Sequence, residues 1–169
     1  MFIYSQFNGL EPAWVSSLIE TGLPVYSPAR PFSEQIELLS KELENVKPSS
    51  TAYEKAEALN LPKNIWKPLA EVKPVLEQAD LISSTEHCIW RDQWLISRAD
   101  LLIVENGASM EIPILAYYLD VRTVAISFTP TGMSPWLAKI AHITINSPNS
   151  VDDILSVLNI TDNFISDKK

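Results

Sequence analysis

The feature that most constrains the fold is the apolar run "LLIV" at residues 101–104, which contains no polar residue. A strand with one face in water alternates apolar and polar residues, whereas a strand buried on both faces is apolar throughout. Strands of the second kind belong mainly to parallel sheets that helices cover on both sides. Four more short β-prone runs lie at residues 1–5, 24–27, 121–127 and 142–146. These runs predict one α/β domain built around a five-stranded sheet.

Helical patterns alternate with these runs, so that successive strands are joined by helices, as in βαβ units. We expect helices at residues 11–23, 32–46, 83–98, 109–120, 132–141 and 150–160. The pattern at 109–120 is apolar all round, which predicts a buried helix. The predicted architecture is a doubly wound, three-layer α/β fold of the flavodoxin or Rossmann kind, with a mostly parallel five-stranded sheet.

Residues 29–82 differ from the rest, because five prolines divide this segment into short pieces. We interpret it as a helical insertion over one end of the sheet, with a second short helix at residues 49–61. The sequence leaves open whether the insertion is a lid or only packing. Residues 1–160 are predicted to form a single domain, and the tail at residues 161–169 is expected to fray.

Composition excludes several classes of function. The formal net charge of −8 disfavours nucleic-acid binding, because an acidic surface repels phosphate backbones. The single cysteine, Cys88, allows no intramolecular disulfide, and His87 and His142 form no metal-ligand pattern. We interpret both histidines as solvated or locally hydrogen-bonded, and we expect neither a metal nor a cofactor. The absence of a signal peptide pattern and of a long apolar run predicts a cytoplasmic protein without a membrane span.

Three carboxylates stand where packing alone would not require them. In doubly wound sheets, ligands bind beyond the carboxyl ends of the strands, and Glu105 ends the predicted strand "LLIVE" there. Glu111 opens the next predicted helix, just after a possible N-cap at Ser109. Asp92 falls in the middle of an apolar helix face that we predict from a turn of about 100° per residue. That face contains Cys88, Ile89, Leu95, Ile96 and Ala99, and excludes Arg91, Arg98, Trp90 and Trp94.

An aspartate on a core-facing stripe is costly unless it is paired or functional. Asp92 could therefore form a buried hydrogen bond or a salt bridge with an arginine, or it could act on a ligand. Between Glu105 and Glu111, the small residues Asn106, Gly107 and Ser109 would let a ligand approach the backbone. A pair of carboxylates with different pKa values suits glycosidic bond chemistry, in which one attacks or stabilises the anomeric carbon and the other protonates the leaving group.

Six pieces of the chain occur in an order and spacing that resemble a known family. They are "FIYSQF", "RDQWLISRAD", "LLIVE", "NGASME", "IPILAYYLD" and "VRTVAIS". Together they resemble the nucleoside 2-deoxyribosyltransferases and the related nucleotide N-glycoside hydrolases. The resemblance implies that Glu111 is the nucleophile at C1′ and that Asp92 contacts the base and handles its proton. It also implies that Glu105 holds the sugar hydroxyls, that Tyr4 orients Glu111, and that the protein is a homo-oligomer.

The expected function is therefore transfer or hydrolysis of the N-glycosidic bond of a 2′-deoxynucleoside or its 5′-monophosphate. Retention of configuration through a covalent glycosyl-enzyme is expected for such a reaction. The alternative is a catalytically inactive nucleotide or nucleotide-sugar sensor on the same fold. The segment "TPTGMSPW" lacks the asparagine that transferases of this family supply from a neighbouring subunit, which favours this alternative. A third possibility is a structural partner protein without a site.

Overall fold

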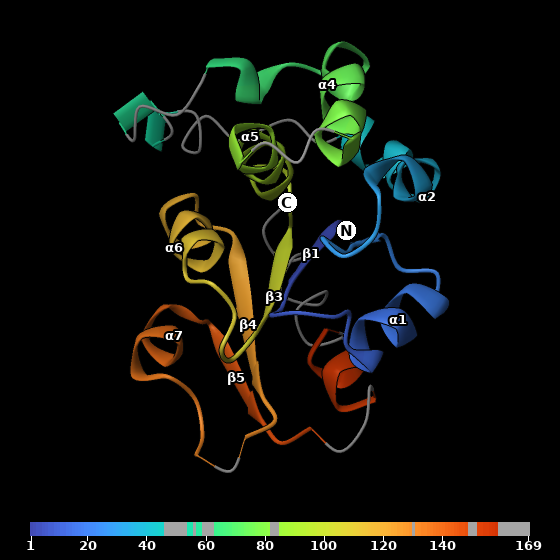
Figure 1. The fold of residues 1–169 in the computed structure, drawn as a ribbon. Coiled ribbons are helices and arrows are strands. Elements are labelled where there is room, and N and C mark those ends of the chain that lie inside the picture. The colour runs from blue at the N-terminus through green and yellow to red at the C-terminus, as the bar shows by residue number, and fades with distance from the viewer. Residues whose placement is uncertain are drawn as a thin grey trace.

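The computed structural model describes residues 1–45, 54–55, 57–58, 63–81, 85–129, 131–148 and 152–158. Its elements, labelled in Figure 1 where there is room, are β1 (Ile3–Gln6), α1 (Ala13–Glu20), β2 (Val25–Tyr26), α2 (Phe32–Asn45), η1 (Lys63–Trp66), α4 (Leu69–Leu81), α5 (Thr85–Ile96), β3 (Leu101–Glu105), α6 (Glu111–Tyr118), β4 (Arg122–Ser127), α7 (Pro135–Ile140) and β5 (Ile143–Asn146). Residues 54–55, 57–58 and 152–158 are also helical. In this described part of the chain, no helix is long and apolar enough to cross a membrane.

The five predicted strands form one sheet in which every pair of neighbours is parallel. The strand order is β2-β1-β3-β4-β5, which is the flavodoxin-like order. Tyr4 on β1 lies beside Tyr26 on β2 and beside Leu102 on β3. The strand order reverses between β1 and β3, so the carboxyl ends of these two strands mark the switch point where such folds bind ligands.

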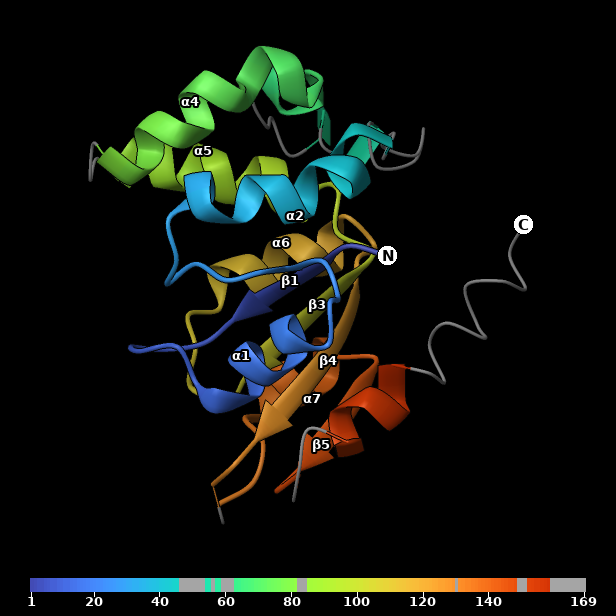
Figure 2. The ribbon, with the colours of Figure 1, turned by 90° about the vertical axis from the view of Figure 1, so that its right-hand side faces the viewer.

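Helices cover both faces of the sheet, which confirms the predicted three-layer fold (Figures 1 and 2). Side chains alternate between the faces along each strand. On β3, for example, Leu102 and Val104 pack with α2, α5, α6 and α7, whereas Leu101 and Ile103 pack with α1 and residues 152–158. All four of these side chains are buried, as the apolar run predicted.

The described part of the 29–82 insertion belongs to the core on the α5 side. Leu39 and Leu43 of α2 and Leu76 of α4 are at most 2% exposed and join the cluster that includes Tyr4 and Leu102. The helix α4 continues through Pro74, so the prediction that prolines leave only short pieces was wrong here. Much of the helix predicted at 49–61 lies outside the described residues, as does the whole of the predicted tail at residues 161–169.

The predicted inward face of α5 was wrong in part. Trp94 is fully buried and Arg98 is 3% exposed, although both were assigned to the outer side, while Ile89 is 51% exposed. The reason is that α5 is covered twice, by the sheet on one side and by η1 and α4 on the other. Arg98 donates to the carbonyl oxygens of Ile65 and Lys67, and Trp94 also donates to Lys67. The side chains of His87 and Cys88 lie outside the description.

The helix α6 is only half buried, which corrects the prediction of a helix buried all round. Pro113 and Ala116 face the core, but Ile114, Tyr117 and Tyr118 are 46%, 52% and 50% exposed. The helices α5 and α7 pack on its two flanks and leave its outer side open (Figure 1). The helices that the structure describes therefore leave part of this apolar surface exposed.

Candidate functional site

The carboxylate of Asp92, on α5, is partly buried close to Tyr4 of β1, near the switch point. The Arg91 Nε atom donates to Asp92 Oδ1 over 3.1 Å, and the two side chains are 10% and 22% exposed. Tyr4, in the middle of β1, is fully buried. Its hydroxyl makes no hydrogen bond of ordinary geometry among the described residues, yet the Asp92 carboxylate is near enough to raise the pKa of this phenol.

Burial controls the proton affinities of this pair. Burial raises the pKa of Asp92, and the charge of Arg91 together with its hydrogen bond opposes that increase. Burial is also the main cause that raises the pKa of Tyr4 well above its usual value, and Asp92 is the second. Tyr4 is therefore a neutral hydrogen-bond donor at physiological pH. A carboxyl group with a raised pKa beside such a donor is suited to holding and releasing a proton.

A second tyrosine and an arginine complete the cluster. The sequence did not predict Tyr26 there, whereas a salt bridge of Asp92 with an arginine was one of its alternatives, and Arg91 forms this salt bridge. The rings of Tyr4 and Tyr26 lie 5.0 Å apart between centroids, and the Arg91 guanidinium lies 5.8 Å from the Tyr26 ring centroid. Arg91 itself is 8% exposed, although it was predicted outside the apolar face. One signal could have identified Tyr26, because "IY" and "VY" occupy equivalent places on neighbouring parallel strands.

Glu105 ends β3 as predicted, but it lies on the other face of the sheet from Asp92. Trp14 of α1 donates its indole Nε1 proton to Glu105 Oε2 over 3.2 Å. Trp14 packs with Leu101 and Ile103, so the contact agrees with the alternation of side chains along β3. This hydrogen bond was not predicted from the sequence.

Glu111 is the first residue of α6, and it is exposed. Ser109 Oγ donates to Glu111 Oε2 over 2.6 Å and accepts a long hydrogen bond of 3.5 Å from the Glu111 backbone N–H. Met110 takes the N-cap position without a side-chain hydrogen bond, so Ser109 stabilises the start of α6 from one residue further out. The interactions that raise the pKa of Tyr4 include Asp92 and Tyr26 but not Glu111.

Asn106 and Gly107 shape the loop between β3 and α6. The Asn106 carboxamide donates to the Gly132 carbonyl oxygen over 3.1 Å and accepts from the Ser134 backbone N–H over 2.9 Å. It thereby connects this loop to the one that follows β4. Gly107 has a φ of +102°, in the region that favours glycine, so it lets the chain turn sharply after β3.

The structure therefore groups the predicted site residues in two places. Tyr4 and Asp92 lie together between β1 and α5, while Glu105 and Glu111 lie in and beside the loop after β3. Among the described residues, none of the three carboxylates is bonded to another. The four predicted substrate-binding residues stand in sequence at the carboxyl end of β3, and their contact with a ligand stays a prediction.

Another carboxylate at this edge of the sheet was not predicted. Glu11, in the loop after β1, accepts hydrogen bonds from Ser16, from Ser27 at 2.5 Å and from the Arg30 Nε atom at 2.8 Å. The hydrogen bond from Arg30 is the first cause, ahead of burial and the serines, that sets the pKa of Glu11 at about 2. Glu11 therefore ties the loop after β2 to the beginning of α1.

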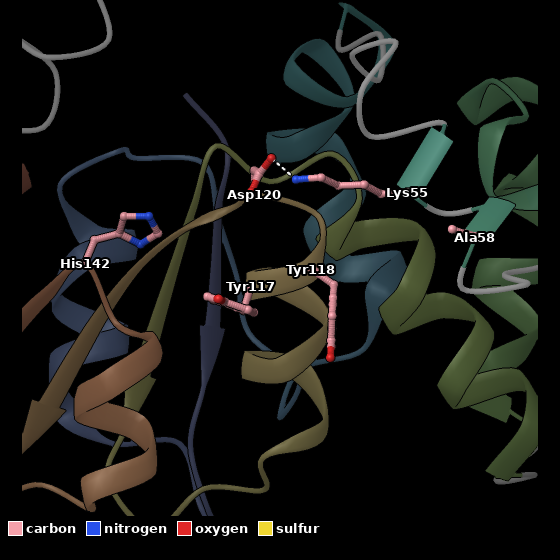
Figure 3. A pocket seen from close by; sticks show the side chains of 6 residues that line it. All are labelled: Lys55, Ala58, Tyr117, Tyr118, Asp120 and His142. Atoms are coloured by element: carbon pink, nitrogen blue, oxygen red, sulfur yellow. Dashed lines mark hydrogen bonds and ion pairs between the residues drawn. The ribbon is translucent and has the colours of Figure 1, made fainter.

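Described residues line two hollows on the α6 side of the molecule. One, of about 470 Å³, lies between α6 and α7, and its lining includes Met110, Ser134 and Trp136. The other, of about 390 Å³, is lined by Lys55, Ala58, Tyr117, Tyr118, Asp120 and His142, and Figure 3 shows the ion pair of Lys55 with Asp120 at its rim. Asp92, Glu105 and Glu111 are not among the lining residues of either hollow. His142 accepts a hydrogen bond at Nδ1 from the Thr123 backbone N–H, which confirms its interpretation as a locally bonded histidine.

The fold and the site together define the class of this protein, which is a parallel α/β protein with an acidic candidate site near the switch point of its sheet. Comparison of the chain with models of known protein families gave no match, and comparisons with curated proteins and with solved structures gave no significant match either.

Proposed function

We propose that this protein cleaves the N-glycosidic bond of a 2′-deoxynucleoside or its 5′-monophosphate, by transfer to a second base or by hydrolysis. The observation that carries the proposal is the enclosed pair of Asp92 and Tyr4 beside the β1–β3 switch point. A buried carboxyl group with a raised pKa can protonate the departing base, which is otherwise a poor leaving group.

In the proposed reaction, the Glu111 carboxylate attacks C1′ and the bond from C1′ to the base nitrogen breaks. Asp92 gives its proton to that nitrogen as the base leaves. A second base or water then attacks C1′, Asp92 takes up the proton, and Glu111 is released. Glu105 binds the sugar hydroxyls. Because Asp92, and not Glu111, is the carboxylate that acts on the Tyr4 phenol among the described residues, we assign Tyr4 to the proton step rather than to the orientation of Glu111.

The test is incubation of the protein with the four deoxynucleosides and their 5′-monophosphates, with and without a second free base, followed by chromatography. Base exchange indicates a transferase, and release of base alone indicates a hydrolase. The variant Glu111→Gln should lose turnover and keep the fold. Glu20→Gln, an exposed glutamate of α1, is the matched control and should keep full turnover. Undiminished turnover of Glu111→Gln would remove Glu111 from the mechanism.

The alternative, a nucleotide or nucleotide-sugar sensor without turnover, is favoured by the ion pair of Asp92 with Arg91. This pairing satisfies a buried carboxylate without a reaction. Glu111 also has a hydrogen-bond partner of its own in Ser109. Isothermal titration with the same nucleotides distinguishes the two functions, because a sensor binds one of them and leaves it intact over hours.

We also propose that the working form is a homo-oligomer in which a second copy covers α6 and α7. Each copy has a protruding indole, Trp136, which is 74% exposed beside the hollow between these helices. The indole of one copy could fill the hollow of the other, as a symmetric interface requires. Together, Tyr117, Tyr118 and Trp136 expose roughly 300 Å², which is a substantial share of the ~800 Å² per partner in a standard interface.

Sedimentation velocity tests the oligomer. The variant Trp136→Ser should shift the protein towards monomer, whereas Leu10→Ser, which changes a side chain that is 92% exposed in the loop after β1, should leave its sedimentation unchanged. A wild-type protein that is monomeric at all concentrations would refute the proposed oligomer without affecting the proposed reaction.

A further inference from the structure

The side chain of Arg91 is held between two groups of the candidate site. Its Nε atom donates to Asp92 Oδ1, and its guanidinium lies over the ring of Tyr26, which in turn packs against Tyr4. We propose that Arg91 is a positioning residue that fixes both the orientation and the charge of Asp92. This inference rests on the proposed function, in which Asp92 handles the proton of the base.

The orientation follows from the contact. Arg91 engages Oδ1 of Asp92, and Oδ2 accepts no hydrogen bond from Arg91 in the described contacts, so this oxygen is the one that the proposal assigns to proton transfer. Arg91 and Asp92 are adjacent in sequence, and α5 would otherwise direct their side chains about 100° apart. The Tyr26 ring lies 5.8 Å from the guanidinium, so Arg91 contacts this ring on one side and Asp92 on the other. In the proposal, these two contacts restrict the orientation of the carboxylate. Rigid support of this kind is what a proton-transfer group needs, because its geometry decides its efficiency.

The charge follows from burial. The Asp92 side chain is 22% exposed, and burial raises the pKa of its carboxyl group. The charged or titratable groups that act on this carboxyl are Arg91 on the same helix and Tyr4 on β1, and Tyr26 on β2 faces both Tyr4 and Arg91. Within the described part of the chain, Arg91 is the cation that acts on Asp92, and it opposes protonation of this carboxylate. Without Arg91, the carboxyl group would hold its proton to a higher pH and would release it too rarely to act in both steps of the reaction.

The chain offers a matched control. Arg98 lies two residues after the end of α5 and is also buried. Its described hydrogen bonds include two to backbone carbonyl oxygens and none to Asp92. Replacement of either arginine removes a buried cation from the same region of the molecule. Only replacement of Arg91 should change Asp92. Arg91→Lys keeps the charge and loses the planar donor group, so it separates charge from orientation.

The experiment is a carboxyl ¹³C NMR titration of the full-length protein, with the Asp92 signal assigned by its loss in Asp92→Asn. In Arg91→Met the pKa of Asp92 should rise by about one to three pH units, as expected when a neighbouring cation is removed. In Arg98→Met it should not change. A folded Arg91→Met protein with an unchanged Asp92 pKa overturns the inference. If Arg91→Met does not fold, Arg91→Lys takes its place in the titration. A carboxyl signal of Asp92 that has the same ¹³C chemical shift and the same pKa in Arg91→Lys as in wild type also overturns the inference.

The pH profile of turnover supplies the second measurement. In Arg91→Met, the limb of the pH profile of kcat that Asp92 governs should move to higher pH. The size of this shift should equal the change in the pKa of Asp92, and KM should change less. A profile that does not move refutes the positioning role, since a structural role alone would lower kcat at all pH values. A shifted Asp92 pKa in a protein that turns over no nucleoside supports the electrostatic role of Arg91 and refutes the proposed function.

Discussion

Replacement of Glu11 by glutamine should remove a pH-dependent part of the stability of the fold. Glu11 accepts hydrogen bonds from Ser16, Ser27 and Arg30, and its side chain is 14% exposed. These donors favour the ionised carboxylate, which places its pKa at about 2 instead of the usual 4.5. Glutamine keeps the shape and one acceptor oxygen, but it loses the charge that binds Arg30.

The magnitude follows from the pKa difference. A change from 4.5 to about 2 is about 2.5 pH units, and at about 1.4 kcal/mol per unit it gives an upper bound near 3.5 kcal/mol. The Arg30 side chain is 37% exposed, so solvent screening reduces its share. Glutamine also keeps some of the hydrogen bonding. We therefore expect Glu11→Gln to lower the free energy of unfolding at pH 7 by about 1.5–2 kcal/mol, which corresponds to about 3–8 °C in Tm for a chain of this length.

The assay is urea unfolding of wild type, Glu11→Gln and the exposed control Glu37→Gln between pH 2 and pH 7. Because the folded-state pKa is depressed, the contribution of Glu11 is complete above about pH 4.5 and disappears as the pH falls towards 2. The difference between wild type and Glu11→Gln should therefore close over that interval, while Glu37→Gln follows wild type throughout. A difference below about 0.5 kcal/mol at pH 7, or one that does not change with pH, would refute the reasoning.

Three more substitutions test other parts of the structure. Arg98→Met should lower the free energy of unfolding, measured in urea, by about 2–4 kcal/mol, because the carbonyls of Ile65 and Lys67 lose a charged donor. A decrease no greater than the one caused by replacing an exposed arginine would contradict this. Gly107→Ala should cost about 1–2 kcal/mol in the same assay, since the φ of +102° disfavours a side chain, and an unchanged midpoint would count against the turn. Asn106→Ala should accelerate hydrogen exchange at the Ser134 backbone amide, because this amide donates a hydrogen bond to Asn106 Oδ1. Equal exchange rates in the variant and in wild type would refute the connection between the two loops.

Much of the fold could be predicted from local sequence. The apolar run 101–104 is buried on both faces because β3 lies in the middle of the sheet, and its lack of alternation carries that information. Strand order and helix faces were less accessible, because they depend on what packs against each element. Trp94 and Arg98 were misplaced because η1 and α4, distant in sequence, cover the outer side of α5. The exposed side of α6 was missed for the opposite reason, since the described part of the chain leaves the apolar residues there half exposed.

The sequence by itself determined the class of the protein, because a period of two or of about 3.6 in hydrophobicity is a local property of each segment. It also marked Asp92, Glu105 and Glu111 as residues that packing does not explain. Only the tertiary structure decided that Asp92 meets Tyr4 and Arg91, while Glu105 bonds Trp14 on the other face of the sheet. Such neighbours are set by the register of β1 and β3 and by the rotation of α5 on them, and these depend on the packing of the whole chain at once.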